Sequence, residues 1–293
     1  MTPLRQRMIE DMQALNLAPL TQTCYVQQVS LFARYFGKSP EVLGPEEIRS
    51  YQVYLTKEKK LAPGSVVIAV SALRFLYKVT LRRDWTVEDI IPTPKKPQKL
   101  PIVLSPEEIR HFLSCVASPK HRTILTTCYA AGLRISEAVR LKPTEINSQR
   151  IVIRVEQGKG QKDRYVMLSG KLLEILRAWW RIEKPKTWLF PSDIPGQHIT
   201  RFTVERACQE AHRISHISKS ITPHSMRHAF AVHLLERGTD VRTIQLLLRH
   251  RSLATTAQFL KIVTSQVCST TSPFDLLPQP VAAASKPAPP KYF

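Results

Sequence analysis

Five cationic or imidazole side chains stand where the sequence pattern indicates a break between structural elements. They are Arg134 in AAGLRISE, Lys159 in QGKGQK, His224 and Arg227 in TPHSMRH, and His250 in LLLRHRSLATT. Each of them alone has an ordinary explanation, because an arginine at a helix start is usually a surface charge and a helical histidine is often structural. The five together indicate a chemistry that none of them indicates singly.

That chemistry is the transfer of a phosphoryl group. Two arginines can bind a phosphodiester with paired, charge-assisted hydrogen bonds and offset the charge that grows in its pentavalent transition state. A lysine can protonate a leaving alkoxide, and a histidine can move a proton or hold a phosphoryl oxygen. Since no cluster of carboxylates suited to magnesium accompanies them, we expect guanidinium groups to take the place of a metal, and we expect no cofactor.

The composition predicts a globular protein of two domains with a polyanionic partner. The chain has 293 residues, of which 43% are hydrophobic and 23% charged, and one domain usually spans about 100–200 residues. Lysine and arginine number 43 against 23 aspartate and glutamate, which gives a net charge of +20. Both halves are basic, so a clamp around a nucleic-acid duplex would let both contact phosphates.

Simpler features exclude several classes of protein. No stretch approaches the roughly 20 apolar residues that a membrane span needs, and the first residues carry Glu10 and Asp11 instead of the apolar run of a signal peptide. The five cysteines are scattered, without a close pair of metal-ligand spacing, which favours reduced thiols over a disulfide framework. We therefore expect a cytoplasmic protein without a membrane partner.

Prolines and lysines mark the division of the chain. The segment IPTPKKPQKLP cannot continue a helix and stays solvated, and a strong helix start follows it, with Ser105 as the N-cap and Glu108 completing a capping box. The end of the chain is rich in proline and alanine. The predicted division is a helical domain at 1–90, a linker at 91–104, a second domain at 105–268 and a partly disordered tail at 269–293.

The period of the apolar residues predicts the elements within each domain. The first domain reads as a bundle of four or five helices without a strand. The second begins with helices, which we place at 105–117, 121–131 and 135–141. A β-hairpin follows, with strands at 150–155 and 164–168 around a glycine turn, and helical patterns then run from Lys171 to about Ile262.

These motifs resemble those of the tyrosine recombinases, the class that includes phage integrases and Xer-like site-specific DNA recombinases. GLRISE, GKGQKDR, HSMRH and RHRSLATT stand in the order and at the separations of that family, and the resemblance covers nearly the whole chain. It implies a mainly α fold of two domains. The first would be a SAM-like helical core-binding bundle, and the second an α+β catalytic domain with a small antiparallel sheet.

The resemblance also implies a role for each of the five residues. Arg134 and Arg227 would bind the scissile phosphate. Lys159 would be the general acid for the 5′-hydroxyl leaving group. His224 would act as general base or phosphate ligand, and His250 would hydrogen-bond the phosphate.

The resemblance assigns two further positions. Glu137 would orient the Arg134 side chain without itself contacting the phosphate. The nucleophile of the family is a tyrosine nine residues after the position of His250, and here that residue is Phe259. Phenylalanine fills a similar volume without a hydroxyl, and no tyrosine lies between Tyr165 and Tyr292. With Phe259 in this place, the chain is expected to be unable to cleave DNA.

Two explanations of Phe259 compete. One is an engineered change of tyrosine to phenylalanine, and the other is a natural protein that binds its sites without cutting them. The otherwise intact set of basic residues favours the first.

The resemblance thus implies a site-specific DNA recombinase or integrase of a mobile element, acting as a homo-tetramer on two sites of double-stranded DNA in the cytoplasm of a bacterium, associated with the nucleoid. The alternative is a non-cleaving, sequence-specific or architectural DNA-binding protein, and a generic RNA-binding protein has little support. We expect residues 261–277 to dock on a neighbouring protomer. The side chains expected to contact DNA are those of Lys95, Lys96, Lys99 and Lys162.

Overall fold

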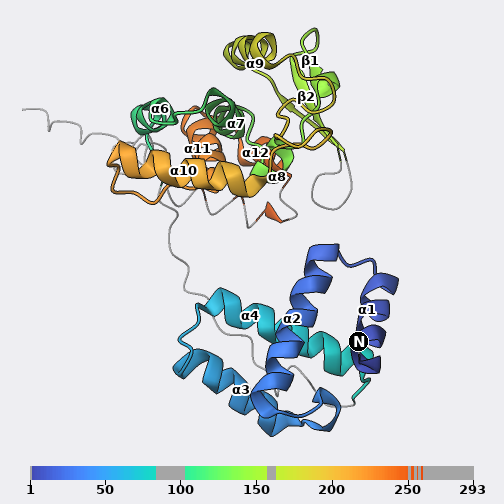
Figure 1. Ribbon diagram of the computed structural model, residues 1–293. Coiled ribbons are helices and arrows are strands. Elements are labelled where there is room, and N and C mark those ends of the chain that lie inside the picture. The colour runs from blue at the N-terminus through green and yellow to red at the C-terminus, as the bar shows by residue number, and fades with distance from the viewer. Residues whose placement is uncertain are drawn as a thin grey trace, which may run out of the picture. The chain divides into compact units, whose positions relative to one another are not determined.

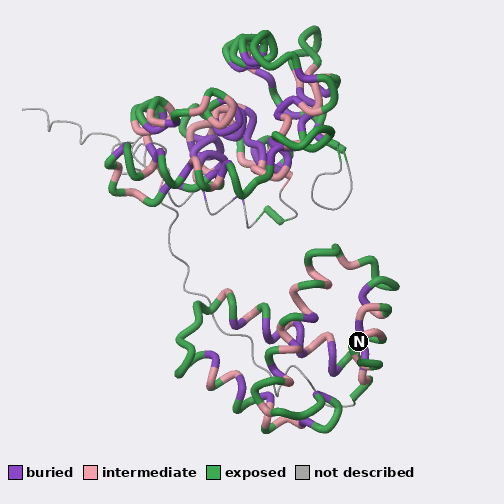
Figure 2. Tube along the Cα trace, viewed as in Figure 1, coloured by how far each residue is buried: buried purple, intermediate pink, exposed green. Residues whose placement is uncertain are grey.

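The computed structural model describes residues 2–83, 103–156 and 163–249, together with residues 252, 253, 256 and 259. The chain forms two compact units, Met1–Lys99 and Leu100–Phe293. The helices of each unit enclose a buried interior of their own (Figures 1 and 2). The predicted linker is described only at residues 103 and 104, and the predicted tail at 269–293 lies outside the described residues.

The first unit is helical in every element that the structure describes there. Its elements are α1 (Pro3–Ala14), α2 (Pro19–Phe36), the 3-10 turn η1 (Pro40–Val42), α3 (Pro45–Lys57), α4 (Pro63–Phe75) and the π-helical turn η2 (Leu76–Thr80). All four α-helices begin with a proline, because its fixed φ suits the first turn and its missing N–H has no partner to lose there. The predicted helical bundle is confirmed.

Aromatic rings fill the interior of this unit. The buried ring of Phe32 meets Tyr51 and Tyr77 edge to face, with ring centroids 5.1 and 6.5 Å apart, an arrangement that aromatic pairs favour. The Tyr77 hydroxyl donates a hydrogen bond to the carbonyl of Pro40 at 2.9 Å. The polar atom of this fully buried side chain is therefore satisfied.

The second unit combines helices with a small sheet, as predicted. Its elements are α6 (Pro106–Ser114), α7 (Pro119–Ala130), α8 (Ile135–Ala138), η3 (Pro143–Glu145), β1 (Ile146–Asn147), β2 (Val152–Val155), β3 (Arg164–Met167), α9 (Gly170–Glu183), α10 (Arg201–Ser215), α11 (Pro223–Glu236) and α12 (Val241–Leu248). Helix α7 is central, since it packs against α6, α8, α9, α10 and α11 (Figure 1).

The sheet is antiparallel in the order β1-β2-β3. Ile153 pairs with Val166 and Val155 with Arg164, so the buried Ile153, Val155 and Val166 share one face while Arg154 points to the other. The predicted hairpin is confirmed as β2 and β3. The two-residue strand β1 was not predicted, because so short a segment carries no alternating pattern.

The predicted helix start after the linker is confirmed. The Ser105 hydroxyl accepts a hydrogen bond from the Glu108 N–H at 3.2 Å, and the Glu108 carboxylate accepts one from the Ser105 N–H at 2.7 Å. The Lys219 ammonium donates to the same carboxylate at 2.7 Å and to the carbonyl of Val103 at 3.2 Å. The beginning of the unit is thereby attached to the segment that precedes α11.

The expectation of continuous helical pattern from Lys171 onward was wrong for one segment. Residues 184–200 contain no helix and join α9 to α10 through an isolated bridge between Pro191 and His198. Three prolines and a glycine interrupt this stretch, and each proline removes a backbone donor that a helix needs. The apolar residues here have a helix-like spacing but pack from a loop.

Candidate active site

Helix α8 places Arg134 and Glu137 side by side. Gly132 adopts the left-handed conformation (φ +63°) after α7, and Arg134 is the N-cap of α8. The Arg134 N–H donates to the Glu137 carboxylate at 2.8 Å, and the guanidinium donates to it at 3.0 Å. The Arg134 side chain remains 25% exposed, so this arginine retains surface with which to contact a ligand.

Glu137 is held by a second arginine as well. The guanidinium of Arg164, at the start of β3, donates to both carboxylate oxygens, at 2.9 and 2.7 Å. Burial alone would raise the pKa of Glu137, but the hydrogen bonds and charge of Arg164, with the N–H and charge of Arg134, lower that pKa to about 2. Glu137 is therefore ionised at every physiological pH.

Arg227 is buried on α11 and joins two distant parts of the unit. Its guanidinium donates to the carbonyl of Gly132 and to the carbonyl of Leu248 at the end of α12. Burial, and next the charge of Arg134, lower the pKa of Arg227 to about 9, which leaves it protonated at pH 7. The guanidinium is thus a fixed positive charge close to Arg134.

Two histidines on α11 lie beside these arginines. His224 stands one turn before Arg227, and partial burial together with the charges of Arg227 and Arg134 lowers its pKa. His228 follows one turn later, its ring centroid 4.3 Å from that of His224. Burial and the neighbouring His224 and Arg227 lower the pKa of His228 to about 4. Both rings are therefore neutral at pH 7.

The ring of Phe259 contacts this group. Its centroid lies 5.4 Å from that of His228, with the two planes 65° apart. Phe259 is buried in a cluster that includes Phe230, Ile244 and Leu248 of α11 and α12. Position 259 is therefore packed against the same helix that carries His224 and Arg227.

This arrangement is suited to an anion. Arg134, Arg164 and Arg227 surround a single carboxylate, that of Glu137, so positive charge exceeds negative charge at this place. A phosphate would compensate the excess and accept hydrogen bonds in the fork geometry that guanidinium groups offer. The neutral imidazole of His224 can accept a proton beside it.

The structure brings together four of the predicted site residues, namely Arg134, Glu137, His224 and Arg227, with Phe259 in contact through His228. The remaining predicted residues lie outside the described part of the chain. They are Lys159 and His250 of the catalytic set, and Lys95, Lys96, Lys99 and Lys162 of the DNA-contacting set.

Two residues of the site, Arg164 and His228, were not predicted. Both stand in the quoted motifs, Arg164 as the last residue of GKGQKDR and His228 as the last of HSMRH. The spacing of His228 four residues after His224 places the two on one helical face. No signal in the sequence pairs Arg164 with Glu137.

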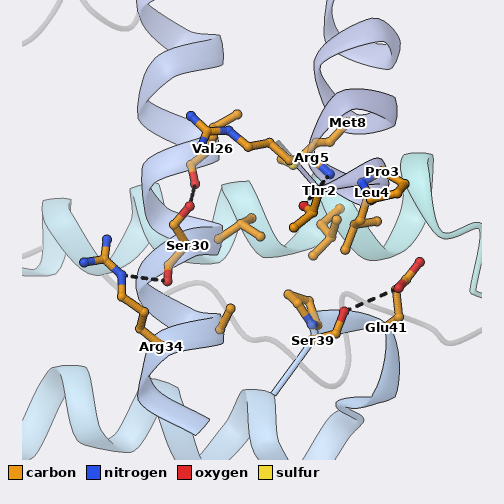
Figure 3. Close-up of a pocket in the computed structure, with 14 residues that line it drawn as sticks. Thr2, Pro3, Leu4, Arg5, Met8, Val26, Ser30, Arg34, Ser39 and Glu41 are labelled. Atoms are coloured by element: carbon orange, nitrogen blue, oxygen red, sulfur yellow. Dashed lines mark hydrogen bonds between the residues drawn. The ribbon is translucent and has the colours of Figure 1, made fainter. Parts of the chain in front are cut away.

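A cavity of about 870 Å³ lies in the first unit, between α1, α2 and η1 (Figure 3). Two of its polar side chains have partners close by in the sequence: Ser30 donates to the carbonyl of Val26 at 2.8 Å, and Arg34 donates to the carbonyl of Ser30 at 3.3 Å. Its lining contains no histidine or cysteine.

Neither a metal centre nor a membrane span is formed by the described residues. No group of three or more histidine, cysteine, aspartate or glutamate side chains there could hold a metal ion. Among the same residues, no helix has both the length and the apolar character to span a membrane.

The amino-acid sequence matches two family profiles that together cover most of the chain. The phage integrase family matches residues 103–264, and the N-terminal SAM-like domain of phage integrases matches residues 4–87. A protein of Sinorhizobium fredii, described as a proposed integrase/recombinase, is 67% identical over 100% of this chain and 95% of its own length. The tyrosine recombinase XerD of Lacticaseibacillus casei is 32% identical over 82% of this chain and 87% of its own.

Solved structures of recombinases share the fold. The XerA recombinase is 27% identical, with a TM-score of 0.53 over 92% of this chain and 99% of that one. The XerH site-specific recombinase, bound to its difH substrate after cleavage, is 21% identical, with a TM-score of 0.72 over 88% of this chain and 80% of that one. From its profile matches and its relatives, the chain belongs to the phage integrase family of tyrosine recombinases.

Proposed function

We propose that the chain is a site-specific DNA recombinase that cuts and rejoins strands through a 3′-phosphotyrosyl intermediate when a tyrosine stands at position 259. The observation that carries this proposal is the ring contact of Phe259 with His228, whose other neighbour is His224. Position 259 is thereby packed against the helix whose Arg227 lies close to Arg134. A tyrosine nucleophile at position 259, the phosphate-binding guanidinium groups of Arg134 and Arg227, and the base His224 would then lie in one active site.

The chemistry of these groups defines the steps. Arg134 and Arg227 bind the scissile phosphate and stabilise the charge of its pentavalent transition state. The tyrosine oxygen attacks phosphorus and gives its proton to His224, while the bond from phosphorus to the 5′ oxygen breaks and Lys159 protonates that oxygen. A 5′-hydroxyl from another strand then reverses the step, with His250 hydrogen-bonded to the phosphate. Because the phosphotyrosyl bond retains the energy of the broken one, rejoining needs no ATP.

Phe259 removes the attacking atom from this scheme. The ring keeps its place in the apolar cluster, but it has no hydroxyl, so the chain with Phe259 binds DNA without cleaving it. The same site contains Arg134, Arg227, His224 and His228. A Tyr→Phe change in an otherwise complete active site explains this combination better than the decay of a whole site.

The test is the Phe259→Tyr variant. A DNA site is first selected from a random duplex library by binding to the unsubstituted chain, and a nicked duplex with that site then serves as a suicide substrate. We expect Phe259→Tyr to form a covalent protein–DNA band on a denaturing gel, with no such band from the unsubstituted chain. Binding by both proteins with no band from either would overturn the catalytic assignment.

Phe259 itself favours one alternative, a DNA-binding or architectural protein that does not cleave. Its aromatic ring is buried among apolar side chains and fulfils a packing role without any chemistry. This alternative shares the DNA-binding behaviour, with affinity that falls steeply as salt rises. It differs in that Phe259→Tyr would still form no covalent band.

The assembly and the DNA contacts are part of the same proposal. We infer a homo-tetramer on two sites of double-stranded DNA, in which residues 261–277 of one protomer dock on the next, in the cytoplasm of a bacterium and associated with its nucleoid. Deletion of residues 261–277 should leave DNA-bound monomers, and tetramers that survive the deletion refute the docking.

Replacement of Lys95, Lys96 and Lys99 by alanine tests the DNA contacts. The slope of the logarithm of the DNA-binding constant against the logarithm of the salt concentration should fall by about 1 for each phosphate that is no longer neutralised. An unchanged slope refutes the assignment of these lysines.

A further inference from the structure

A triad of charges, with two of its three side chains buried, links α8 to the hairpin of the sheet. It consists of Arg134, Glu137 and Arg164. The Glu137 and Arg164 side chains are only 6% and 7% exposed, and Arg164 is paired with Val155, the last residue of β2 before the chain turns back into β3. The sequence places Lys159 five residues before Arg164.

The hydrogen bonds of the triad leave the carboxylate no freedom to turn. Oxygen Oε1 of Glu137 accepts from Arg134 Nη1 at 3.0 Å and from Arg164 Nη1 at 2.9 Å. Oxygen Oε2 accepts from the Arg134 N–H at 2.8 Å and from Arg164 Nη2 at 2.7 Å. Each oxygen thus receives one donor from each arginine, and rotation of the carboxylate would break bonds to both.

Stability alone does not account for this pair. Removing two charges from water costs about as much as their attraction returns, so a buried ion pair is weak evidence for stabilisation. The same hairpin carries an ordinary pair for comparison, Arg154 with Asp163 at 2.8 Å, whose side chains are 49% and 46% exposed. The pair of Arg164 with Glu137 differs from this exposed pair in three respects. Both side chains are buried, the guanidinium donates a hydrogen bond to each carboxylate oxygen, and the carboxylate also contacts Arg134.

We propose that Arg164 is a positioning residue for the reaction: it fixes the Glu137 carboxylate so that Arg134 is held toward the phosphate, and it attaches the loop end of the β2–β3 ladder to the same carboxylate. This inference rests on the proposed function in one respect, the binding of the phosphate by Arg134. Arg164 itself contacts neither the phosphate nor the reacting atoms. Its effect passes through Glu137.

The groups around Glu137 determine the effect of replacing Arg164. Besides the two arginines of the triad, Arg227 on α11 and the Cys128 thiol on α7 lie near enough to interact electrostatically with Glu137. Burial raises the pKa of the Cys128 thiol, so that thiol is neutral. Without Arg164, burial is opposed only by Arg134 and Arg227, and the pKa of Glu137 rises. Protonation of Glu137 then deprives Arg134 of its charged partner as the pH falls.

The first experiment measures this pH dependence. All variants carry Phe259→Tyr, and the single-turnover rate of covalent adduct formation on the suicide substrate is followed between about pH 5 and pH 8. Arg164→Met should lower the rate by roughly 10- to 100-fold, as misplacement of a catalytic group does, and the loss should deepen toward low pH. Arg164→Lys should recover part of the rate, and Arg154→Met, the matched control on β2, should not change it.

The double variant Arg164→Met/Glu137→Gln completes this experiment. It should be slow at every pH and lack the added pH dependence, because no carboxyl is left to titrate. A loss in Arg164→Met that is parallel to the parent profile at all pH values overturns the inference, as does an unchanged rate.

A second experiment does not depend on cleavage. The exchange of the Arg134 guanidinium hydrogens with solvent is measured by NMR in the full, unsubstituted chain, and again with Arg164→Lys or Arg154→Met. We expect faster exchange with Arg164→Lys and no change with Arg154→Met. If Phe259→Tyr forms no adduct while this difference is seen, the proposed function fails and the positioning of Arg134 stands. If the exchange rates are equal, the positioning role is refuted even where cleavage occurs.

Discussion

A methyl group added at Gly132 should disrupt the support of Arg227. Gly132 has φ +63°, and a Cβ built on it would stand 2.6 Å from two ring atoms of Phe230 and 3.2 Å from Cδ2 of Leu248. Phe230 is buried, so its ring cannot move aside freely. The two carbonyls that hold the Arg227 guanidinium belong to Gly132 and Leu248. A methyl group that pushes Gly132 away from Leu248 therefore weakens the two hydrogen bonds that hold the Arg227 guanidinium.

The cost of Gly132→Ala has two parts. A left-handed backbone costs an alanine about 1–2 kcal/mol, and overpacking of a buried site costs about 1–3 kcal/mol. The free energy of unfolding should therefore fall by about 2–5 kcal/mol. For a unit of this size, each kcal/mol corresponds to a change in Tm of about 2–4 °C.

Urea unfolding of the full chain, followed by tryptophan fluorescence, measures this cost. Three of the four tryptophans, Trp179, Trp180 and Trp188, belong to the second unit, so the signal reports chiefly on it. Gly238→Ala is the matched control, because Gly238 has φ +85° with nothing within 4 Å of its added Cβ. The control should lose only the backbone part.

A double-mutant cycle with Phe230→Leu isolates the steric part. The smaller side chain should tolerate the added methyl group, so that Gly132→Ala costs less in the Phe230→Leu background than in the parent. Equal losses for Gly132→Ala and Gly238→Ala, or no relief from Phe230→Leu, would refute the steric reasoning.

Two further predictions concern pH. The pKa of Glu137 is about 2 in the fold against 4.5 when exposed, so its ionised form stabilises the fold above about pH 4.5 by roughly 3 kcal/mol, and this contribution is lost as the pH falls toward about 2. Glu137→Gln should therefore flatten the acid limb of the unfolding free energy between these pH values, and an unchanged limb contradicts the ion triad. The pKa of His228 is about 4 against 6.5 when exposed, so the unfolded chain binds more protons between these values and stability falls as the pH drops from about 6.5 to about 4. His228→Leu should remove that part of the pH dependence in urea unfolding at fixed ionic strength, and a slope equal to that of the parent shows that the ring is not held neutral.

Local structure was predictable where the signal lies within a few residues. The capping box of Ser105 and Glu108 predicted α6, and the alternating residues of β2 and β3 predicted the hairpin. Residues 184–200 were predicted wrongly as part of a helical run, although three prolines stand in this segment and each removes a backbone donor. Packing and hydrogen bonds with distant residues decide such a segment.

The sequence predicted which residues belong to the site better than it predicted which of them contact one another. Arg134, Glu137, His224 and Arg227 were identified from their motifs, and the structure places them together. Their partners were beyond prediction, because the contacts span long separations. Arg164 meets Glu137 across 27 positions, and Arg227 meets the Gly132 carbonyl across 95.

The order of the residues alone establishes which chemical groups are available: the basic charge, the arginines and histidines at element breaks, and a phenylalanine without a hydroxyl at position 259. Side-chain identity settles these properties, and no folding is needed to read them. The tertiary structure decided which charges meet. Only the packing of α8, α11 and β3 brings one buried carboxylate between two arginines and a histidine ring against Phe259, because contacts between residues far apart in the chain exist only once the core that holds them has formed.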